Sequence, residues 1–207
     1  MTKLLKRNRM RIVLVGASGT MGTHLVNAWK NEHELITVGT KSGDIKADIT
    51  SIEAIKKMYK EVGNFDALVS TAGPTYVGPW KTLTPEVFKN GLDGKLLGQI
   101  NLVLLGQDYI NPNGSFTLIT GGLTYEPQYF FANASVANGG VEAFVRAAAI
   151  ELKDGVRINA VSPTVIENSP QYFDYFPGEI PTTMRALEFG FRKSVFGAKT
   201  GEIIKLY

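Results

Sequence analysis

Near its beginning the sequence reads Ile12-Val13-Leu14-Val15-Gly16-Ala17-Ser18-Gly19-Thr20-Met21-Gly22. A run of apolar, mostly β-branched residues is typical of a strand that is buried on both faces, as strands of parallel sheets are. A glycine-rich turn follows, and a helical pattern starts at Thr20. Glycine lets the backbone approach a diphosphate closely, and the helix N-terminus attracts the anion through its dipole and free N–H groups. The unit therefore predicts a dinucleotide-binding site, held by Gly16, Ser18, Gly19, Thr20, Met21 and Gly22.

Outward from this unit, short β-rich runs alternate with helical stretches. We expect strands at 12–15, 35–38, 47–49, 67–70, 116–120, 157–161 and 202–206, and helices at 20–31, 52–62, 85–110, 133–153 and 184–196. Such alternation implies right-handed crossovers and a parallel sheet. The prediction is one α/β domain over residues 10–207, a Rossmann-type, doubly wound parallel sheet of about seven strands with helices on both faces. Ser51 is expected to cap the second helix.

Composition narrows the function. The chain has 207 residues, 44% of them hydrophobic and 20% charged, as an ordinary globular protein has. The absence of cysteine excludes disulfides and thiolate metal sites, and two histidines, His24 and His33, argue against a histidine metal site or a Ser-His-Asp triad. No apolar run approaches the roughly 18 residues of a membrane span. We therefore expect no metal, no membrane partner and a cytoplasmic location.

The chain begins with a basic segment. Lys3, Lys6, Arg7 and Arg9 lie in it without an acidic residue. We interpret residues 1–9 as a disordered extension, because Met10 could itself begin the domain. A nucleic-acid-binding arm is the alternative, but it rests on a charge run alone, so no nucleic-acid partner is expected.

The end of the second predicted strand indicates which cofactor is preferred. Sites for NAD place an acidic residue there to bind the ribose hydroxyls. Here Thr40, Lys41 and Ser42 follow the strand, and no carboxylate occurs before Asp44. An ammonium and two hydroxyls suit a 2′-phosphate, so NADP(H) is favoured over NAD(H), although Lys41 as a solvated loop charge is the alternative. Asp48 is placed either to accept from the adenine amino group or to cap the next helix.

Three further segments carry a family resemblance. They are Asp66-Ala67-Leu68-Val69-Ser70-Thr71-Ala72-Gly73, Arg157-Ile158-Asn159-Ala160-Val161-Ser162-Pro163 and Gly197-Ala198-Lys199-Thr200-Gly201. In order and spacing they resemble the fourth strand and Asn-Asn-Ala-Gly turn, the sixth strand and the C-terminal Thr-Gly turn of the short-chain dehydrogenase/reductase family. The chain resembles a short, divergent bacterial subgroup of it from Met10 onward. The resemblance adds Ala72, Gly73 and Pro163 to the expected cofactor contacts. Independently of it, the segment 164–183 is long for a connection within a compact domain, which favours a substrate or lid loop.

The resemblance also exposes a departure in the catalytic residues. The family uses a Ser, a Tyr and a Lys four residues after the Tyr. Matching the helix through Phe144 places Ala134 at the Tyr position and Asn138 at the Lys position, whereas counting back from Asn159 shifts the first to Asn133. The Ser position falls near Gly121, beside Thr120. The resemblance thus implies an atypical active site.

Lys95 stands where the family has a helical Asn near its catalytic Lys. Because Asn138 stands where that Lys belongs, the two changes resemble a compensating swap. We expect the Lys95 ammonium to reach Asn138 or the nicotinamide ribose; the alternative is that it faces solvent or pairs with Asp93. Lys95, Thr120 and Asn138 are therefore the candidate catalytic residues. Tyr125 and Tyr129 are alternative proton donors, or simply packing residues.

Two functions fit these features. One is an NADP(H)-dependent oxidoreductase acting on a small carbonyl or alcohol. The other is an NADP(H)-binding sensor or regulatory protein without turnover. In either case the helix at 133–153 is apolar nearly all round between Ala134 and Ile150, which predicts burial on both sides, and the helix at 85–110 also carries apolar residues. In the resembled family these helices pair across a two-fold axis, so we expect a homodimer or homotetramer. A small-molecule ligand is the other expected partner.

Overall fold

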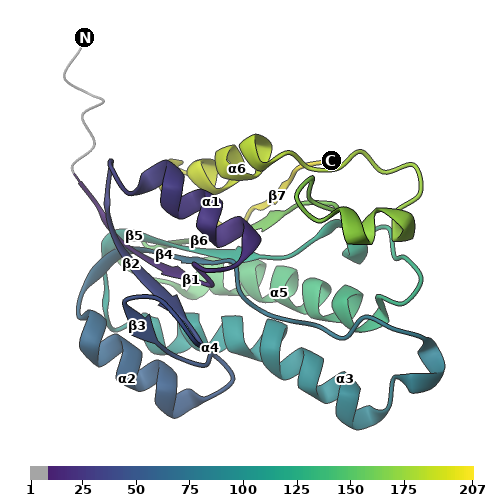
Figure 1. Cartoon of the computed structure of the whole chain (residues 1–207). Helices are drawn as coiled ribbons and strands as arrows, with labels where there is room; N and C mark the ends of the chain where they lie inside the picture. The colour runs from purple at the N-terminus through teal and green to yellow at the C-terminus, as the bar shows by residue number, and fades with distance from the viewer. Residues whose placement is uncertain (1–8) are drawn as a thin grey trace.

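The computed structural model describes residues 9–207, and its strands form one parallel sheet (Figure 1). In sheet order these are β3 (Ile45–Lys46), β2 (Glu34–Gly39), β1 (Arg11–Val15), β4 (Phe65–Ser70), β5 (Ile110–Ile119), β6 (Arg157–Ser162) and β7 (Ile203–Lys205). The order reverses between β1 and β4, and such a reversal opens a crevice at the carboxyl ends of the strands. The predicted Rossmann-type sheet is confirmed. The expected basic extension falls on residues 1–8, outside the described residues, and on Arg9.

Helices cover both faces of the sheet (Figure 1). α1 (Thr20–Trp29) and α6 (Met184–Phe196) lie on one face, where Trp29 and Phe191 are fully buried. α2 (Ile52–Val62), α4 (Gly98–Gly106) and α5 (Ala132–Glu151) lie on the other. α3 (Pro85–Leu92) continues through a π-helical turn, η2 (Asp93–Leu97), into α4. No helix within residues 9–207 is long and apolar enough to cross a membrane.

Several expected boundaries are wrong for physical reasons. The third strand is Ile45–Lys46 rather than 47–49, because Asp48 Oδ1 accepts from the Thr50 N–H and turns the chain toward α2. The helical stretch 85–110 ends at Gly106, and β5 begins at Ile110. The expected start of β5 is too late, because the pairing of β5 with β4 is irregular there. Between two successive paired positions, β4 moves forward only from Phe65 to Ala67, whereas β5 moves forward from Ile110 to Ser115. The residues between bulge out of the ladder, so their pattern does not look like a strand.

The segment 164–183 has more structure than an irregular loop. It contains a 3-10 turn, η4 (Pro170–Tyr175), and a parallel bridge joins Ile166 to Thr182 at its base. The ring of Phe131 packs against those of Tyr172, Tyr175 and Phe176. Figure 1 shows this segment at the same end of the molecule as the loop between β4 and α3, which carries the 3-10 turn η1 (Trp80–Thr82). The expected cap is confirmed, since Ser51 Oγ accepts from the Ala54 N–H.

Candidate functional site

The loops after β4, β5 and β6 surround a cavity of about 360 Å³. Its wall includes Met21 from α1, Lys95 from η2, Ala134 and Asn138 from α5, and Pro163 after β6. The segment 164–183 closes one side with Val165, Ile166, Tyr172 and Phe176. A cavity of this size, largely apolar with a few polar groups, is typical of a small-molecule site. All three candidate catalytic residues line it.

The glycine turn lies next to this cavity. Gly16 has φ +83°, and a Cβ there would lie 2.9 Å from Ala72 N and from Thr71 Oγ1. A Cβ on Gly22 would lie 2.2 Å from Gly16 O. The turn is therefore closed tightly onto β4, and Thr71 Oγ1 donates to Gly16 O at 3.1 Å. No side chain caps α1 at its N-cap, Gly19. The first N–H groups of this helix thus remain suited to an anion, and the turn fits a diphosphate.

Residues Thr40, Lys41 and Ser42 are exposed at the end of β2, and none of them lines the cavity. A Cβ on Gly39 would lie 3.7 Å from Ser18 Oγ, so the end of β2 adjoins the glycine turn. Asp44, the first carboxylate beyond β2, accepts from both the N–H and the hydroxyl of Thr37. These hydrogen bonds lower the pKa of Asp44 and hold its carboxylate against β2.

Asp48 is exposed in the turn after β3. Its Oδ1 accepts from both the N–H and the hydroxyl of Thr50. Ser51, not Asp48, caps α2. The helix-capping alternative for Asp48 is therefore wrong, and adenine binding remains a prediction.

Lys95 lies inside the π-helical turn that joins α3 to α4. Such turns occur often at functional sites, because they displace a residue from the regular helical register. Gln99 Nε2 donates to Lys95 O at 2.9 Å and so binds the carbonyl of this turn. Gly73 has φ +129°, and a Cβ there would lie 2.8 Å from Lys95 Cα. The glycine thus allows the turn after β4 to pack directly on Lys95.

The Lys95 side chain is partly buried and lines the cavity. Burial lowers its pKa to about 8. Within residues 9–207, no hydrogen bond or ion pair engages the ammonium. The alternative pairing with Asp93 is wrong, because Asp93 pairs with Lys89 at 2.5 Å. The expected direct hydrogen bond to Asn138 is also wrong, since Asn138 Oδ1 has no partner.

Asn138 is 1% exposed, and its amide is only half satisfied. Nδ2 donates to Gly121 O at 3.4 Å, while the buried Oδ1 accepts nothing from the described residues. An unpaired buried acceptor is unfavourable and calls for an explanation. Ala134, one turn earlier on α5, presents only a methyl group to the same cavity. Lys95 and Asn138 thus bring a free donor and a free acceptor to one space.

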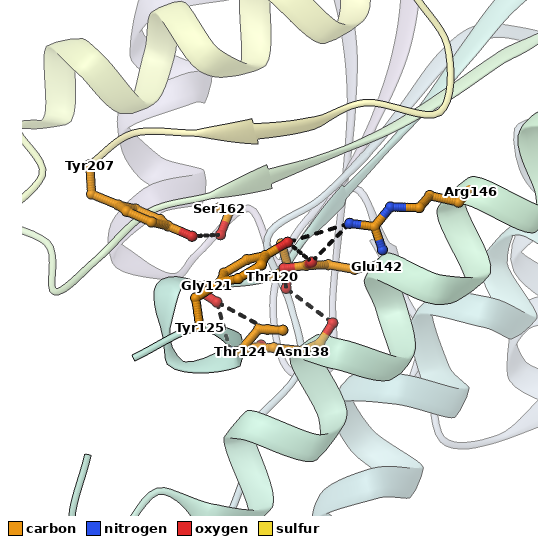
Figure 2. Close-up of polar contacts among 9 residues, drawn as sticks. All are labelled: Thr120, Gly121, Thr124, Tyr125, Asn138, Glu142, Arg146, Ser162 and Tyr207. Carbon is orange, nitrogen blue, oxygen red and sulfur yellow. Dashed lines mark hydrogen bonds and ion pairs between the residues drawn. The ribbon is translucent and has the colours of Figure 1, made fainter. Parts of the chain in front are cut away.

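Tyrosines 125 and 129, the alternative proton donors, do not line the cavity. Tyr129 is 87% exposed. Tyr125 instead donates to Glu142, a buried carboxylate on α5 that also accepts from Thr120 (Figure 2). Our sequence reasoning missed Glu142. Its spacing of four residues from Asn138, itself four from Ala134, was the available signal, because residues at such intervals share a helix face.

No group of three or more His, Asp or Glu side chains in the described part of the chain could hold a metal ion. The doubly wound parallel sheet, with a glycine turn after β1 and a cavity at the carboxyl ends of its strands, defines a protein of the Rossmann class. Within that class, the chain belongs to the short-chain dehydrogenase/reductase family. A family model described as enoyl-(acyl carrier protein) reductase matches residues 1–174.

Solved structures resemble the chain over nearly its whole length. The protein lin1944 from Listeria innocua is 47% identical, with a TM-score of 0.93, and the match covers 96% of this chain and 100% of that one. A small-chain dehydrogenase in complex with NADPH has a TM-score of 0.84 at 20% identity, with 96% of each chain covered. At that identity the second likeness shows the fold alone.

Curated relatives are longer. General stress protein 39 of Bacillus subtilis is 28% identical over 156 residues, which cover 69% of this chain and 54% of the relative. The peroxisomal 2,4-dienoyl-CoA reductase SPS19 of Saccharomyces cerevisiae is 27% identical over 118 residues, 56% of this chain and 40% of the relative. The chain therefore spans about half the length of these curated relatives.

The environment of Lys95 predicts a pH-dependent stability. Because the folded-state pKa of about 8 lies below the unfolded value, the unfolded chain binds more protons between these two pKa values. Stability should therefore rise with pH in that window. Lys95→Met should raise the free energy of unfolding at pH 7 by roughly 1–3 kcal/mol, with the advantage shrinking from pH 8 to about 10. Urea unfolding at several pH values measures this.

The matched control is Lys89→Met, since Lys89 lies two turns earlier and is exposed. Its effect should stay within about 0.5 kcal/mol. An advantage of Lys95→Met that stays constant from pH 7 to 10 would show that the ammonium is not desolvated.

Proposed function

We propose that the chain is an NADP(H)-dependent oxidoreductase that acts on a small carbonyl or alcohol with an acid/base set other than Ser-Tyr-Lys. One observation carries the proposal. Lys95 and Asn138 bring an unpaired ammonium and an unpaired buried carbonyl oxygen to one cavity beside the glycine turn. A ligand hydroxyl or carbonyl oxygen can accept from the first.

The residues present fit the cofactor. Gly16, Gly19 and Gly22 carry no side chain where a diphosphate would approach the backbone. The N-terminus of α1, which no side chain caps, supplies N–H donors. Ser18, Thr20, Met21, Ala72, Gly73 and Pro163 are assigned to the same binding site. Lys41, with Thr40 and Ser42, is assigned to the 2′-phosphate, and Asp48 to the adenine. When bound, the cofactor supplies or accepts a hydride.

The chain's own residues supply the remaining chemistry. The Lys95 ammonium polarises the carbonyl oxygen and stabilises the negative charge that develops there, as a positioned cation does in a water-poor site. Asn138 and Thr120 are the polar residues of the cavity wall beside it. Ala134, in the proposed alignment, leaves the space that the family fills with a phenol.

The cavity wall restricts the substrate. Val77, Phe131, Val165, Tyr172 and Phe176 make much of it apolar or aromatic. Because the volume is about 360 Å³, we infer a compact carbonyl compound with an apolar body.

Hydride transfer tests the function. Stopped-flow mixing of NADPH-loaded protein with a panel of small aldehydes and ketones should show NADPH oxidation. Lys95→Met should reduce the single-turnover rate by roughly 10²–10³-fold, the typical loss on removing one electrostatic stabiliser, while NADPH still binds. Lys89→Met serves as the control, with an expected rate like that of the wild type. If NADPH binds but no compound of the panel oxidises it, the result would contradict the oxidoreductase proposal and favour the NADP(H)-binding sensor.

Cofactor preference gives a second test. NADPH should bind more tightly than NADH, and Lys41→Ala should weaken NADPH by about tenfold, or 1.4 kcal/mol, with little effect on NADH. Fluorescence titration of both nucleotides measures this. Lys46→Ala is the matched control, because Lys46 is an exposed lysine on the neighbouring β3. Equal affinities of the wild type for both nucleotides would contradict the assignment of Lys41.

Assembly gives a third test. Three hydrophobic residues are exposed on these helices: Leu104 on α4, and Val136 and Ile150 on α5. Val136 and Ile150 are separated by two repeats of seven residues, so they lie on the same face of α5. We propose that this face joins two copies into a homodimer, or a tetramer built from it. Light scattering should show a dimer or tetramer that the double variant Leu104→Glu/Val136→Glu converts to monomer. Phe189→Glu, on the opposite face of the sheet, should leave the assembly intact. A monomeric wild type at micromolar concentration would contradict this.

A further inference from the structure

Glu142 is a carboxylate buried inside α5, with only 1% of the residue exposed. Figure 2 shows its contacts. Oε1 lies 3.3 Å from Thr120 Oγ1, whose single proton is shared with Asn138 O at 3.2 Å, and Oε2 accepts from the Tyr125 hydroxyl at 2.5 Å. Arg146, one turn further along α5, donates to Oε2 at 3.4 Å. The carboxylate thus joins a residue of the cavity wall to two residues at the surface.

The stability of the fold does not explain why a carboxylate is buried at position 142. Removing a carboxylate from water is unfavourable, and a partner charge seldom repays the loss unless its geometry is excellent. The Arg146 contact is long, and the arginine side chain is 54% exposed. An apolar side chain on this helix face would fill the same space without a desolvation penalty. A functional reason for Glu142 is therefore worth testing.

The two residues whose hydroxyls bind Glu142 lie in different places. Thr120 lines the cavity and is 3% exposed in total. Tyr125 follows the 3-10 turn η3 (Gly122–Thr124), lies outside the cavity wall and is 42% exposed. Hydrogen bonds therefore connect Thr120, a residue of the cavity wall, through Glu142 to Tyr125, a partly exposed residue.

We propose that Thr120, Glu142 and Tyr125 form a proton path between the cavity and solvent, with Glu142 holding the transferred proton. This inference rests on the proposed oxidoreductase function. Lys95 supplies charge to the substrate oxygen, and the path supplies its proton. In this division of roles Glu142 acts through Thr120 and is a positioning and relay residue.

The proton balance of the step follows from these contacts. In the direction of alcohol oxidation, the bound cofactor would accept the hydride. The substrate hydroxyl proton passes to the Thr120 oxygen as the Thr120 hydroxyl proton passes to the Glu142 carboxylate, which becomes a carboxylic acid. The acid then gives its proton to the Tyr125 oxygen as the Tyr125 hydroxyl proton passes to water, and Glu142 is again a carboxylate. Carbonyl reduction would reverse each transfer.

Charged and titratable groups from several elements face this path. Arg146 lies on α5 itself, and Lys205, on β7, has its ammonium 3.4 Å from the centre of the Tyr125 ring. Tyr207, after β7, lies 3.4 Å from Ser162 Oγ through its hydroxyl, and burial with the nearby Glu142 charge raises its pKa. The hydrogen bond to Glu142 raises the pKa of Tyr125.

Kinetics of conservative variants test the path. Glu142→Gln should lower kcat by about 100-fold, at the lower end of the range for a lost acid/base group, without changing NADPH affinity. It should also remove one limb of the pH profile of kcat, and Glu142→Asp should restore part of the rate. Tyr125→Phe should raise the solvent deuterium isotope effect on kcat. Glu188→Gln is the matched control, because Glu188 pairs with Arg192 one turn along α6, away from the cavity.

A readout independent of turnover separates this inference from the proposed function. In protein labelled with ¹³C at glutamate Cδ, the Glu142 signal is assigned by its loss in Glu142→Gln. Adding NADP⁺ with a small alcohol should shift this signal in the wild type but not in Thr120→Val. Shifts without any turnover would overturn the oxidoreductase and leave the path in place. A Glu142 signal that does not shift when ligands are added, or a Glu142→Gln variant with an unchanged kcat and pH profile, would overturn the path.

Discussion

The buried side-chain amide of Gln99 is the interaction on which the cavity depends. Its Oε1 accepts from the Ile119 N–H at 2.8 Å, and its Nε2 donates to Ile119 O and Lys95 O, both at 2.9 Å. One fully buried residue thus binds the last residue of β5 and the π-helical turn of Lys95. Because leaving any of these buried groups unpaired would be unfavourable, the arrangement permits little adjustment. Thr120, next after Ile119, and Lys95 are therefore held in fixed relation.

This restraint allows an unfavourable group to persist at the cavity. A desolvated ammonium and an unpaired amide oxygen both reduce stability, and neither would survive where the surroundings could relax. Gln99 holds the backbone of Lys95 from one side, while Gly73 packs against its Cα from the other. A lysine on a freely exposed turn would move to solvent. Here the backbone is fixed, so the side chain is directed to the cavity wall.

The sequence predicted the features that depend on local chemistry. The glycine turn, the cap of Ser51 and the parallel strands follow from short patterns whose physical causes act within a few residues. The bulge before Ser115 did not, because it depends on how β5 meets β4. Gln99 and Glu142 were missed for the same reason. Their partners Ile119, Thr120 and Tyr125 lie about 20 residues away in sequence, and a lone polar residue in a helix normally indicates an exposed face.

The position of Glu142 links the two halves of the proposed site. Ala134, Asn138 and Glu142 follow one another at intervals of four residues, so they form a single row along α5. In the proposed assignment this row no longer carries a phenol and an ammonium. The ammonium comes from η2, the hydroxyl from the end of β5, and the row supplies space, an acceptor and a proton-holding carboxylate. Such redistribution is possible because a doubly wound sheet brings several loops to one edge, where different elements can supply the same chemical groups to one cavity.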